Sequence, residues 1–178
     1  MNTTIISKRC IAIGGVPAVG KSTIVSNFFK YNDYWQDYKY KKLRGHYSKE
    51  LNLFIIGIYG TSVFSGTDRL SMAVNPDFVE FVKKYSDKYN ILFEGDRLFT
   101  LNNLLMLEKY YDLKTCIICS NETKQRHIQR KDNQSETFIK GRTTKINNIL
   151  SNIKNFTMYD NNKLGDDKII YNKIIPLL

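Results

Sequence analysis

A phosphate-binding pattern lies near the start of the chain. Residues 14–23 read GGVPAVGKST, which contains G-x-x-x-x-G-K-[ST] in full. Glycines let the backbone turn so that successive N–H groups face phosphate oxygens, and the helix that follows presents its positive N-terminal end. Lys21 is then expected to reach the β- and γ-phosphates, and the Ser22 hydroxyl to complete the shell of Mg²⁺. The residues predicted to hold a nucleoside triphosphate are Gly15, Val16, Pro17, Ala18, Val19, Gly20, Lys21, Ser22 and Thr23.

Two carboxylates and an arginine follow an apolar run farther along the chain. Residues 91–93 are Ile, Leu and Phe, and Glu94, Gly95, Asp96 and Arg97 come directly after them. Ligands of open α/β sheets bind at the carboxyl ends of the strands, where these side chains would lie. We therefore interpret Glu94 or Asp96 as a holder of Mg²⁺ or its waters and Arg97 as a phosphate contact. A capped loop with a local ion pair is the alternative.

A third segment, residues 64–71, reads FSGTDRLS and follows another apolar run. Phosphoryl transfer to an alcohol requires a carboxylate that orients the hydroxyl group and accepts its proton. Asp68 is the preferred general base, although the residues alone do not decide between Asp68, Glu94 and Asp96. Arg69 would pair with a phosphate of the acceptor. The alternative is that Asp68 merely caps a helix beginning near Arg69.

Basic residues gather between positions 121 and 145. Arg126 and Arg130 are four residues apart, so a helix starting near Asn121 would show both guanidinium groups on one face. Such a pair suits a lid at about residues 121–145 that closes over the triphosphate and stabilises the transferred group. A solvated basic helix is the alternative. The other members of the group are Lys124, Lys131, Gln134, Lys140, Arg142 and Lys145.

The candidate functional residues must be positioned by strands and helices, which the sequence predicts from apolar runs that alternate with helical patterns. Strands are predicted at residues 10–14, 53–59, 91–94, 115–119 and 168–171. One helix is predicted to open at Asn75, Pro76 and Asp77, and another to span residues 144–156. The alternation predicts an α/β sandwich with a mainly parallel sheet.

Composition limits the class of protein. The chain has 178 residues, of which 42% are hydrophobic and 25% charged, so we expect a single globular domain and neither a disordered nor a membrane protein. The net charge of +10 indicates a polyanionic partner such as nucleic acid, although generic surface lysine explains it equally well. Three cysteines and no secretory pattern favour a reducing cytosol. Cys116 and Cys119 would face opposite sides of a strand, which argues against a metal pair.

Together these segments resemble the P-loop nucleoside and nucleotide kinase superfamily. GGVPAVGKST is similar to its phosphate loop, ILFEGDR to its strand-end acid and arginine segment, and the Arg126 and Arg130 pair to its lid. FSGTDRLSMAV, ILFEGDRLF and QSETFIKGRTTK are similar to bacteriophage kinases that phosphorylate 5-hydroxymethyluridine within DNA, a step in thymidine hypermodification. The resemblance covers roughly residues 10–150. It implies a three-layer P-loop fold with a helical lid, ATP and Mg²⁺ as cofactors, and the cytoplasm of an infected host cell.

Two features depart from the superfamily pattern. Ala18 stands where many relatives carry glycine, which we expect to be tolerated if its φ is negative. Residues 33–52 carry no family motif and form a predicted insertion. There, tyrosine and tryptophan alternate with basic side chains that include Lys41, Lys42 and Arg44, a mixture that can stack on bases and neutralise phosphates. The alternative is a surface insertion whose aromatic rings pack locally.

The sequence therefore predicts an ATP-dependent kinase that phosphorylates the hydroxymethyl group of 5-hydroxymethyluracil in DNA. A base inside a duplex must be flipped out to reach such a site. One alternative is a deoxynucleoside monophosphate kinase acting on free nucleotides. Another is a P-loop protein that binds nucleotide without catalysis, although a mere binder needs fewer acids. The sequence leaves the nucleotide preference and the oligomeric state open.

Overall fold

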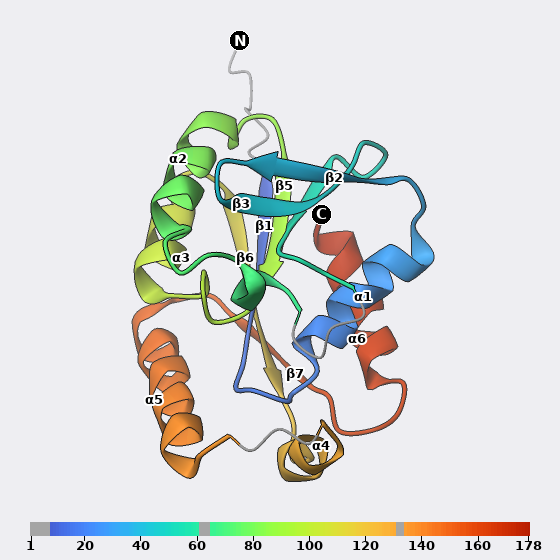
Figure 1. Ribbon diagram of the computed structural model, residues 1–178, viewed down its shortest axis with the longest axis vertical. Helices are drawn as coiled ribbons and strands as arrows, with labels where there is room; N and C mark the ends of the chain where they lie inside the picture. The colour runs from blue at the N-terminus through green and yellow to red at the C-terminus, as the bar shows by residue number, and fades with distance from the viewer. Residues whose placement is uncertain (1–7, 61–64, 131–133) are drawn as a thin grey trace.

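A seven-stranded, mainly parallel sheet forms the centre of the molecule (Figure 1). The computed structural model describes residues 8–60, 65–130 and 134–178, with the backbone alone described at Arg130. Phe64 and Lys131, which the sequence analysis singled out, lie outside these ranges. The strand order is β2-β3-β4-β5-β1-β6-β7. The bounds are β1 Arg9–Gly14, β2 Trp35–Tyr40, β3 Leu43–Ser48, β4 Leu53–Ile56, β5 Asn90–Glu94, β6 Asp112–Cys119 and β7 Thr157–Asp160.

Helices cover both faces of the sheet, which gives three layers (Figure 1). On one face lie α1 Lys21–Tyr31 and α6 Asp166–Ile174, and on the other lie α2 Asn75–Tyr85, α3 Leu101–Leu107 and α5 Glu136–Asn152. Helix α4, Thr123–Arg130, follows β6, and two 3₁₀ turns span Thr67–Arg69 (η1) and Ile175–Leu177 (η2). The predicted α/β class with a mainly parallel sheet is confirmed. In the described ranges, no helix combines the length and apolar character needed to cross a bilayer.

Alternation along the strands divides the core into two clusters. In β1, Cys10 and Ala12 pack with α2, α3 and α5, whereas Ile11 and Ile13 pack with α1 and α6. Successive side chains of a strand point to opposite faces, so one apolar run serves both layers. The same rule separates Cys116 and Cys119, whose side chains join different clusters. The expectation that they face opposite sides is confirmed.

The predicted strand at residues 168–171 is wrong. This segment lies inside α6, where Ile170, Tyr171 and Ile174 are buried at helical spacing against the sheet. Asp166 in the first turn is favourable at a helix N-terminus. A short run of apolar residues does not by itself distinguish a strand from a buried helix face. The final strand of the sheet is instead β7, which pairs in parallel with β6.

The helix predicted at residues 144–156 is displaced toward its N-terminus. Helix α5 begins at Glu136, and the Ser135 hydroxyl caps it by accepting a hydrogen bond from the Phe138 N–H at 3.2 Å. The helix ends at Asn152, so Phe156 lies beyond it. A serine followed by glutamate is a helix-start signal. The earlier start places more of the basic segment on a helix.

The insertion at residues 33–52 forms the hairpin of β2 and β3, which extends the sheet with antiparallel pairs. Its aromatic rings pack against the protein: the centroid of Tyr38 lies 5.0 Å from that of Phe54, and the centroid of Trp35 lies 4.9 Å from that of Phe29. Tyr34 differs from them, being 85% exposed. Local packing of these rings, the alternative named above, therefore describes Tyr38 and Trp35.

The carboxyl ends of β1, β4, β5, β6 and β7 meet at one edge of the sheet, since these strands run in parallel. The turn of the hairpin lies toward the same edge, because the Gly57 N–H, just after β4, donates to the Arg44 carbonyl at 2.9 Å. Loops from six strands therefore converge where an α/β sheet binds ligands.

Gly14 at the end of β1 is tightly enclosed. A Cβ atom there would lie 2.2 Å from the ring of Phe99, which is 1% exposed. We predict that Gly14→Ala lowers the free energy of unfolding by about 1–3 kcal/mol, because an added methyl group in a well-packed core forces its neighbours to shift. The matched change Gly141→Ala, in the interior of α5 with open space around the new methyl group, should stabilise the protein by about 0.5–1 kcal/mol. Urea unfolding measures both, and wild-type stability of Gly14→Ala would contradict this packing.

Candidate active site

A cleft of about 440 Å³ opens at the carboxyl edge of the sheet. The loop before α1, the end of β5, the η1 turn and helix α5 all contribute to its walls. The structure thus brings together residues from three separately predicted segments. Those lining the cleft include Pro17, Ala18, Gly20, Lys21, Ser22, Asp68, Glu94, Asp96 and Arg97.

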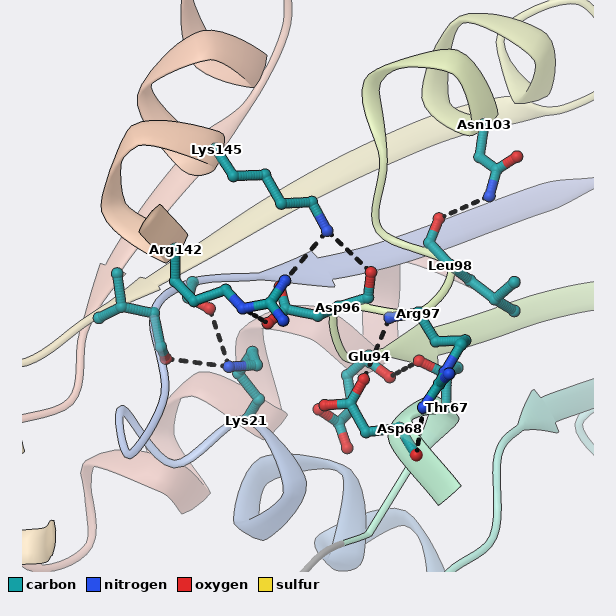
Figure 2. Close-up of polar contacts among 12 residues, drawn as sticks. Lys21, Thr67, Asp68, Glu94, Asp96, Arg97, Leu98, Asn103, Arg142 and Lys145 are labelled. Atoms are coloured by element: carbon teal, nitrogen blue, oxygen red, sulfur yellow. Dashed lines mark hydrogen bonds and ion pairs between the residues drawn. The ribbon is translucent and has the colours of Figure 1, made fainter. Parts of the chain in front are cut away.

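The loop of residues 15–20 leads directly into α1, which begins at Lys21 without a side-chain cap and without an acidic residue in its first turn. The positive end of this helix therefore faces the cleft. Lys21 folds over the loop, and its Nζ donates to the carbonyl oxygens of Gly15 at 2.8 Å and Val16 at 3.0 Å (Figure 2). An uncapped helix N-terminus beside a lysine is suited to binding phosphate.

Ala18 corrects one expectation. Its φ is +64°, in the left-handed region, so the condition under which alanine was expected to be tolerated, a negative φ, is not met. A non-glycine residue in this region is strained, typically by about 1–3 kcal/mol. The surroundings hold it there, since Ala18 is buried and its carbonyl accepts a hydrogen bond from Arg126 Nη1 at 3.4 Å.

Glu94 is buried at the centre of the cleft, with 2% of its surface exposed. The Ser22 hydroxyl donates to its Oε1 at 2.8 Å. Burial raises the pKa of Glu94 to about 7, against the opposing effects of Lys21 and the Ser22 hydrogen bond, and Asp68 and Asp96 add to the rise. Gly66, at φ +82°, leaves room for the Glu94 carboxyl group, because a Cβ atom at position 66 would lie 2.0 Å from Glu94 Oε1. The Glu94 carboxyl group is therefore buried by the start of α1, which carries Ser22, and by the loop that carries Gly66.

Asp68 and Asp96 lie on the same cleft but have different partners (Figure 2). One oxygen of Asp68 accepts the Arg97 N–H at 3.0 Å, and within the described ranges the other carries no hydrogen bond. Both oxygens of Asp96 face cations of α5: Arg142 Nε lies 3.1 Å from Oδ2, and Lys145 Nζ lies 3.5 Å from Oδ1. Both oxygens of Asp96 are therefore occupied by cations, whereas one oxygen of Asp68 is open to the cleft. The geometry favours Asp68 over Asp96 as a base.

Apart from Lys21, one of the basic residues predicted to bind phosphate or DNA lines the cleft, and the others lie elsewhere on the surface. Arg97 lines the cleft, and its Nη2 donates to the Asp68 carbonyl at 3.0 Å. Arg69 is exposed in η1 and does not line it. The hairpin residues Lys41, Lys42 and Arg44 are exposed outside it as well, and Lys41 is paired with Glu80.

Arg126 lines a second cavity, of about 420 Å³, on the other side of Gly20. Its Nη2 donates to the Asn161 carbonyl at 2.6 Å, and Asn161 Nδ2 donates to the Val19 carbonyl at 2.8 Å. Arg126 is thus fixed against the loop of residues 15–20 and away from the acids of the first cleft. The side chain of Arg130, its predicted partner, lies outside the described residues.

Several residues of the site were not singled out as functional from the sequence. The Tyr59 hydroxyl is buried, and burial together with the nearby Glu94 and Asp68 raises its pKa. Arg142 and Lys145 had been seen only as members of a basic group. Their spacing of three residues on a helix could have indicated a shared partner. The remaining ones are Met72, Gln134, Phe138 and Asn161.

The oxygen atoms around Ser22 fit a magnesium ion. Mg²⁺ prefers oxygen ligands, and proteins often supply only one or two beside substrate phosphates and water. The Ser22 hydroxyl and the Glu94 carboxyl group, in contact at 2.8 Å, form such a pair. Among the described residues there is no cluster of three or more His, Cys, Asp or Glu side chains suited to a metal. A Mg²⁺ ion bound there would therefore need its other ligands from water or from a bound phosphate.

Comparison with known proteins assigns no relationship. No family model matches the sequence, and no curated protein matches it.

The pKa of Glu94 has a consequence for stability. The pKa of Glu94 is about 7 in the folded protein and 4.5 for an ordinary glutamate, so the folded state binds the Glu94 proton more tightly than the unfolded state does. Stability is therefore lost as the pH rises from below the lower value to above the higher one, by about 3 kcal/mol. We predict that Glu94→Gln removes this loss and is the more stable protein at about pH 8. Urea unfolding across this pH range measures it, and identical profiles would contradict the burial of Glu94.

Proposed function

We propose that this protein is an ATP- and Mg²⁺-dependent P-loop kinase that phosphorylates the hydroxymethyl group of 5-hydroxymethyluracil in DNA. The observation that supports it best is the arrangement of two cavities, which share Gly20 at the N-terminus of α1. A phosphate-binding loop between two cavities suits a transferase, because the donor can enter from one side and the acceptor from the other.

The second cavity is suited to the nucleoside part of the donor. Arg126 supplies a planar guanidinium group, Leu164 an apolar surface, and Asn162 a polar side chain. Nucleotide sites combine such surfaces with a few polar groups. The triphosphate would then run past Gly20 toward Lys21 and the first cleft. Arg126 contributes to donor binding in this arrangement, and α4 with the first turns of α5 forms the proposed lid.

The residues of the first cleft account for the chemistry. Lys21 and the N-terminus of α1 bind the phosphates, while Ser22 and Glu94 would hold the metal. Mg²⁺, when bound, neutralises charge on the triphosphate. The acceptor hydroxyl oxygen forms a bond to the γ-phosphorus, the bond from that phosphorus to the bridging β,γ-oxygen breaks, the hydroxyl proton passes to Asp68, and ADP leaves.

Asp96 has a positioning role in this arrangement. Its contacts with Arg142 and Lys145 join the loop after β5 to α5. Arg97, fixed by the backbone of Asp68, is placed to meet a phosphate in the cleft. The three acids therefore have different proposed roles. Glu94, buried beside Ser22, would hold the metal, and Asp68, which has an open oxygen, would accept the proton. Asp96, paired with Arg142 and Lys145, positions the loop.

DNA as the acceptor is supported by charge and by the segments similar to phage DNA kinases. The net charge is +10. Lys41 and Lys42 form the turn between β2 and β3, and Arg44 lies near the start of β3, toward the edge that holds the cleft. Neutralisation of backbone phosphates by such groups is the dominant sequence-independent contribution to DNA binding.

A deoxynucleoside monophosphate kinase is the second candidate. Arg97 and Arg142 both line the first cleft, and either could bind the phosphate of a free monophosphate. Arg142 already pairs with Asp96, however, at 3.1 Å. A nucleotide binder without catalysis is less well supported, because it would have no use for Asp68 beside the loop.

The function is tested by incubation of the protein with γ-labelled ATP and a panel of acceptors. The panel contains 5-hydroxymethyluracil DNA, ordinary DNA, free nucleosides and deoxynucleoside monophosphates. Label on the modified DNA alone supports the proposal. Label on free monophosphates with none on DNA supports the second candidate, and label on no acceptor, with ATP bound, supports a nucleotide binder.

Substitutions test the roles of the acids and of Lys21. Asp68→Asn should lower kcat by about 10²-fold or more because the proton acceptor is lost, with ATP binding retained. Lys21→Ala should abolish transfer, and circular dichroism should show an intact fold. Asp87→Asn, on the surface after α2, is the matched control. Full activity in Asp68→Asn with none in Asp96→Asn would move the base to Asp96.

Salt dependence tests the acceptor. A protein that neutralises DNA phosphates loses affinity with a log–log slope of about −0.9 per phosphate, whereas a mononucleotide has no such array. We predict that KM for DNA rises steeply with salt while KM for ATP changes less. Replacing Lys41, Lys42 and Arg44 with alanine should flatten the slope, and replacing Lys154, Lys168 and Lys173 should not. A salt-insensitive reaction would contradict DNA binding at this edge.

A further inference from the structure

One part of the first cleft has no role in the proposed phosphoryl transfer. It is lined by Met72, Gln134 and Phe138, none of which carries charge or reacts with phosphate. Met72 is 83% exposed and Phe138 is 39% exposed, although both are large apolar side chains. Exposed apolar groups at a cleft are typical of a ligand surface. These three residues are referred to below as the apolar wall.

Phe138 is held in a defined position. It lies in the first turn of α5, where the Ser135 hydroxyl accepts its backbone N–H. The guanidinium carbon of Arg142 lies 4.6 Å from the centre of its ring. Arg142 is in turn fixed by Asp96 at 3.1 Å. A preorganised aromatic ring at a cleft is suited to stacking on a flat ligand, because little rotamer freedom remains to be lost on binding.

Gln134 contributes an unsatisfied polar group at the same place. Its Oε1 is buried and has no hydrogen-bond partner in the parts of the chain that the structure describes. Buried polar atoms are nearly always paired in folded proteins, so an unpaired one that lines a cleft calls for a ligand donor. A glutamine amide offers one acceptor and one donor edge, side by side. The imide edge of uracil, an N–H beside a carbonyl, is complementary to it.

We infer that the apolar wall binds the base of the acceptor nucleotide, with Phe138 and Met72 contacting the flat ring and Gln134 reading its imide edge. This inference rests on the proposed function and names its specificity-determining residues. A base in this place must leave the duplex stack, as bases do in enzymes that modify them. Asp68 and Arg97 line the same cleft, so a substituent of the bound base would share the cavity with the proposed proton acceptor.

The sharpest test replaces Gln134 by glutamate. A carboxylate only accepts hydrogen bonds, so it pairs with the amino group of cytosine better than with the imide of uracil. Short single-stranded oligonucleotides carrying one 5-hydroxymethyluracil or one 5-hydroxymethylcytosine are compared by fluorescence anisotropy and by phosphate transfer. Relative to wild type, Gln134→Glu should shift the ratio of the two affinities by about 10-fold or more toward the cytosine form.

Gln36→Glu, on an exposed position of β2, is the matched control for the added negative charge. It should change the binding of both oligonucleotides by the same factor and leave the preference as in wild type. An unshifted preference in Gln134→Glu overturns the inference.

Substitution of Phe138 tests stacking. Phe138→Ala should raise KM for the modified oligonucleotide by about 10-fold, with KM for ATP unchanged, since loss of a stacking partner weakens base binding. Phe138→Tyr keeps the ring and should restore binding. Phe156→Ala is the matched control, because Phe156 is also 39% exposed but lies outside the cleft. Equal effects of Phe138→Ala and Phe156→Ala would overturn a stacking role.

The two proposals fail separately. If wild type phosphorylates 5-hydroxymethyluracil DNA while Gln134→Glu and Phe138→Ala behave like it, the function stands and the base site is wrong. If wild type transfers no phosphate but the anisotropy preference shifts with Gln134→Glu, the base site stands and the proposed kinase function is wrong.

Discussion

The buried carboxyl group of Glu94 is the constraint around which this edge of the protein is arranged. Its hydrogen bond from Ser22 joins the end of β5 to the start of α1. On the other side, the Thr67 hydroxyl donates to the Glu94 carbonyl at 2.9 Å, which fixes the η1 turn. Gly66 must lack a side chain for the carboxyl group to fit. The start of α1, the η1 turn and the end of β5 are thereby held at fixed positions relative to one another. Removal of the carboxylate from water is what raises its pKa.

Three acids converge on one cleft, and their environments give them different properties. Glu94 is buried beside a hydroxyl group, Asp96 is matched by two cations of α5, and Asp68 keeps an oxygen open. Environment, more than residue type, assigns tasks to neighbouring carboxyl groups. The Asp96 contacts have a second effect, because they connect the strand end to the helix that carries Phe138 and Arg142. Binding of a ligand at the apolar wall and the arrangement of the acids are therefore physically linked.

The sequence predicted what depends on local pattern. The strand, loop and helix around Lys21, the position of Glu94 at the end of β5 and the alternation within β1 all follow from short-range spacing. Residues 168–171 were mistaken for a strand because four apolar-rich residues fit either structure, and only packing against the sheet decides. The tyrosines of the β2–β3 hairpin suggested base stacking, yet most pack on α2. The pairing of Arg142 with Asp96, 46 residues apart in sequence number, and the open carboxyl oxygen of Asp68 depend on long-range contacts that spacing does not encode.

Whether this cleft transfers a phosphoryl group to a base in DNA is decided most directly by the chemical identity of the product. DNA containing 5-hydroxymethyluracil is incubated with the protein, ATP and Mg²⁺, digested to nucleosides and analysed by mass spectrometry. The proposed function predicts a new nucleoside heavier than 5-hydroxymethyldeoxyuridine by one phosphoryl group, located on the hydroxymethyl oxygen by fragmentation. Unmodified 5-hydroxymethyldeoxyuridine as the sole product, under conditions in which the protein binds ATP, would contradict it.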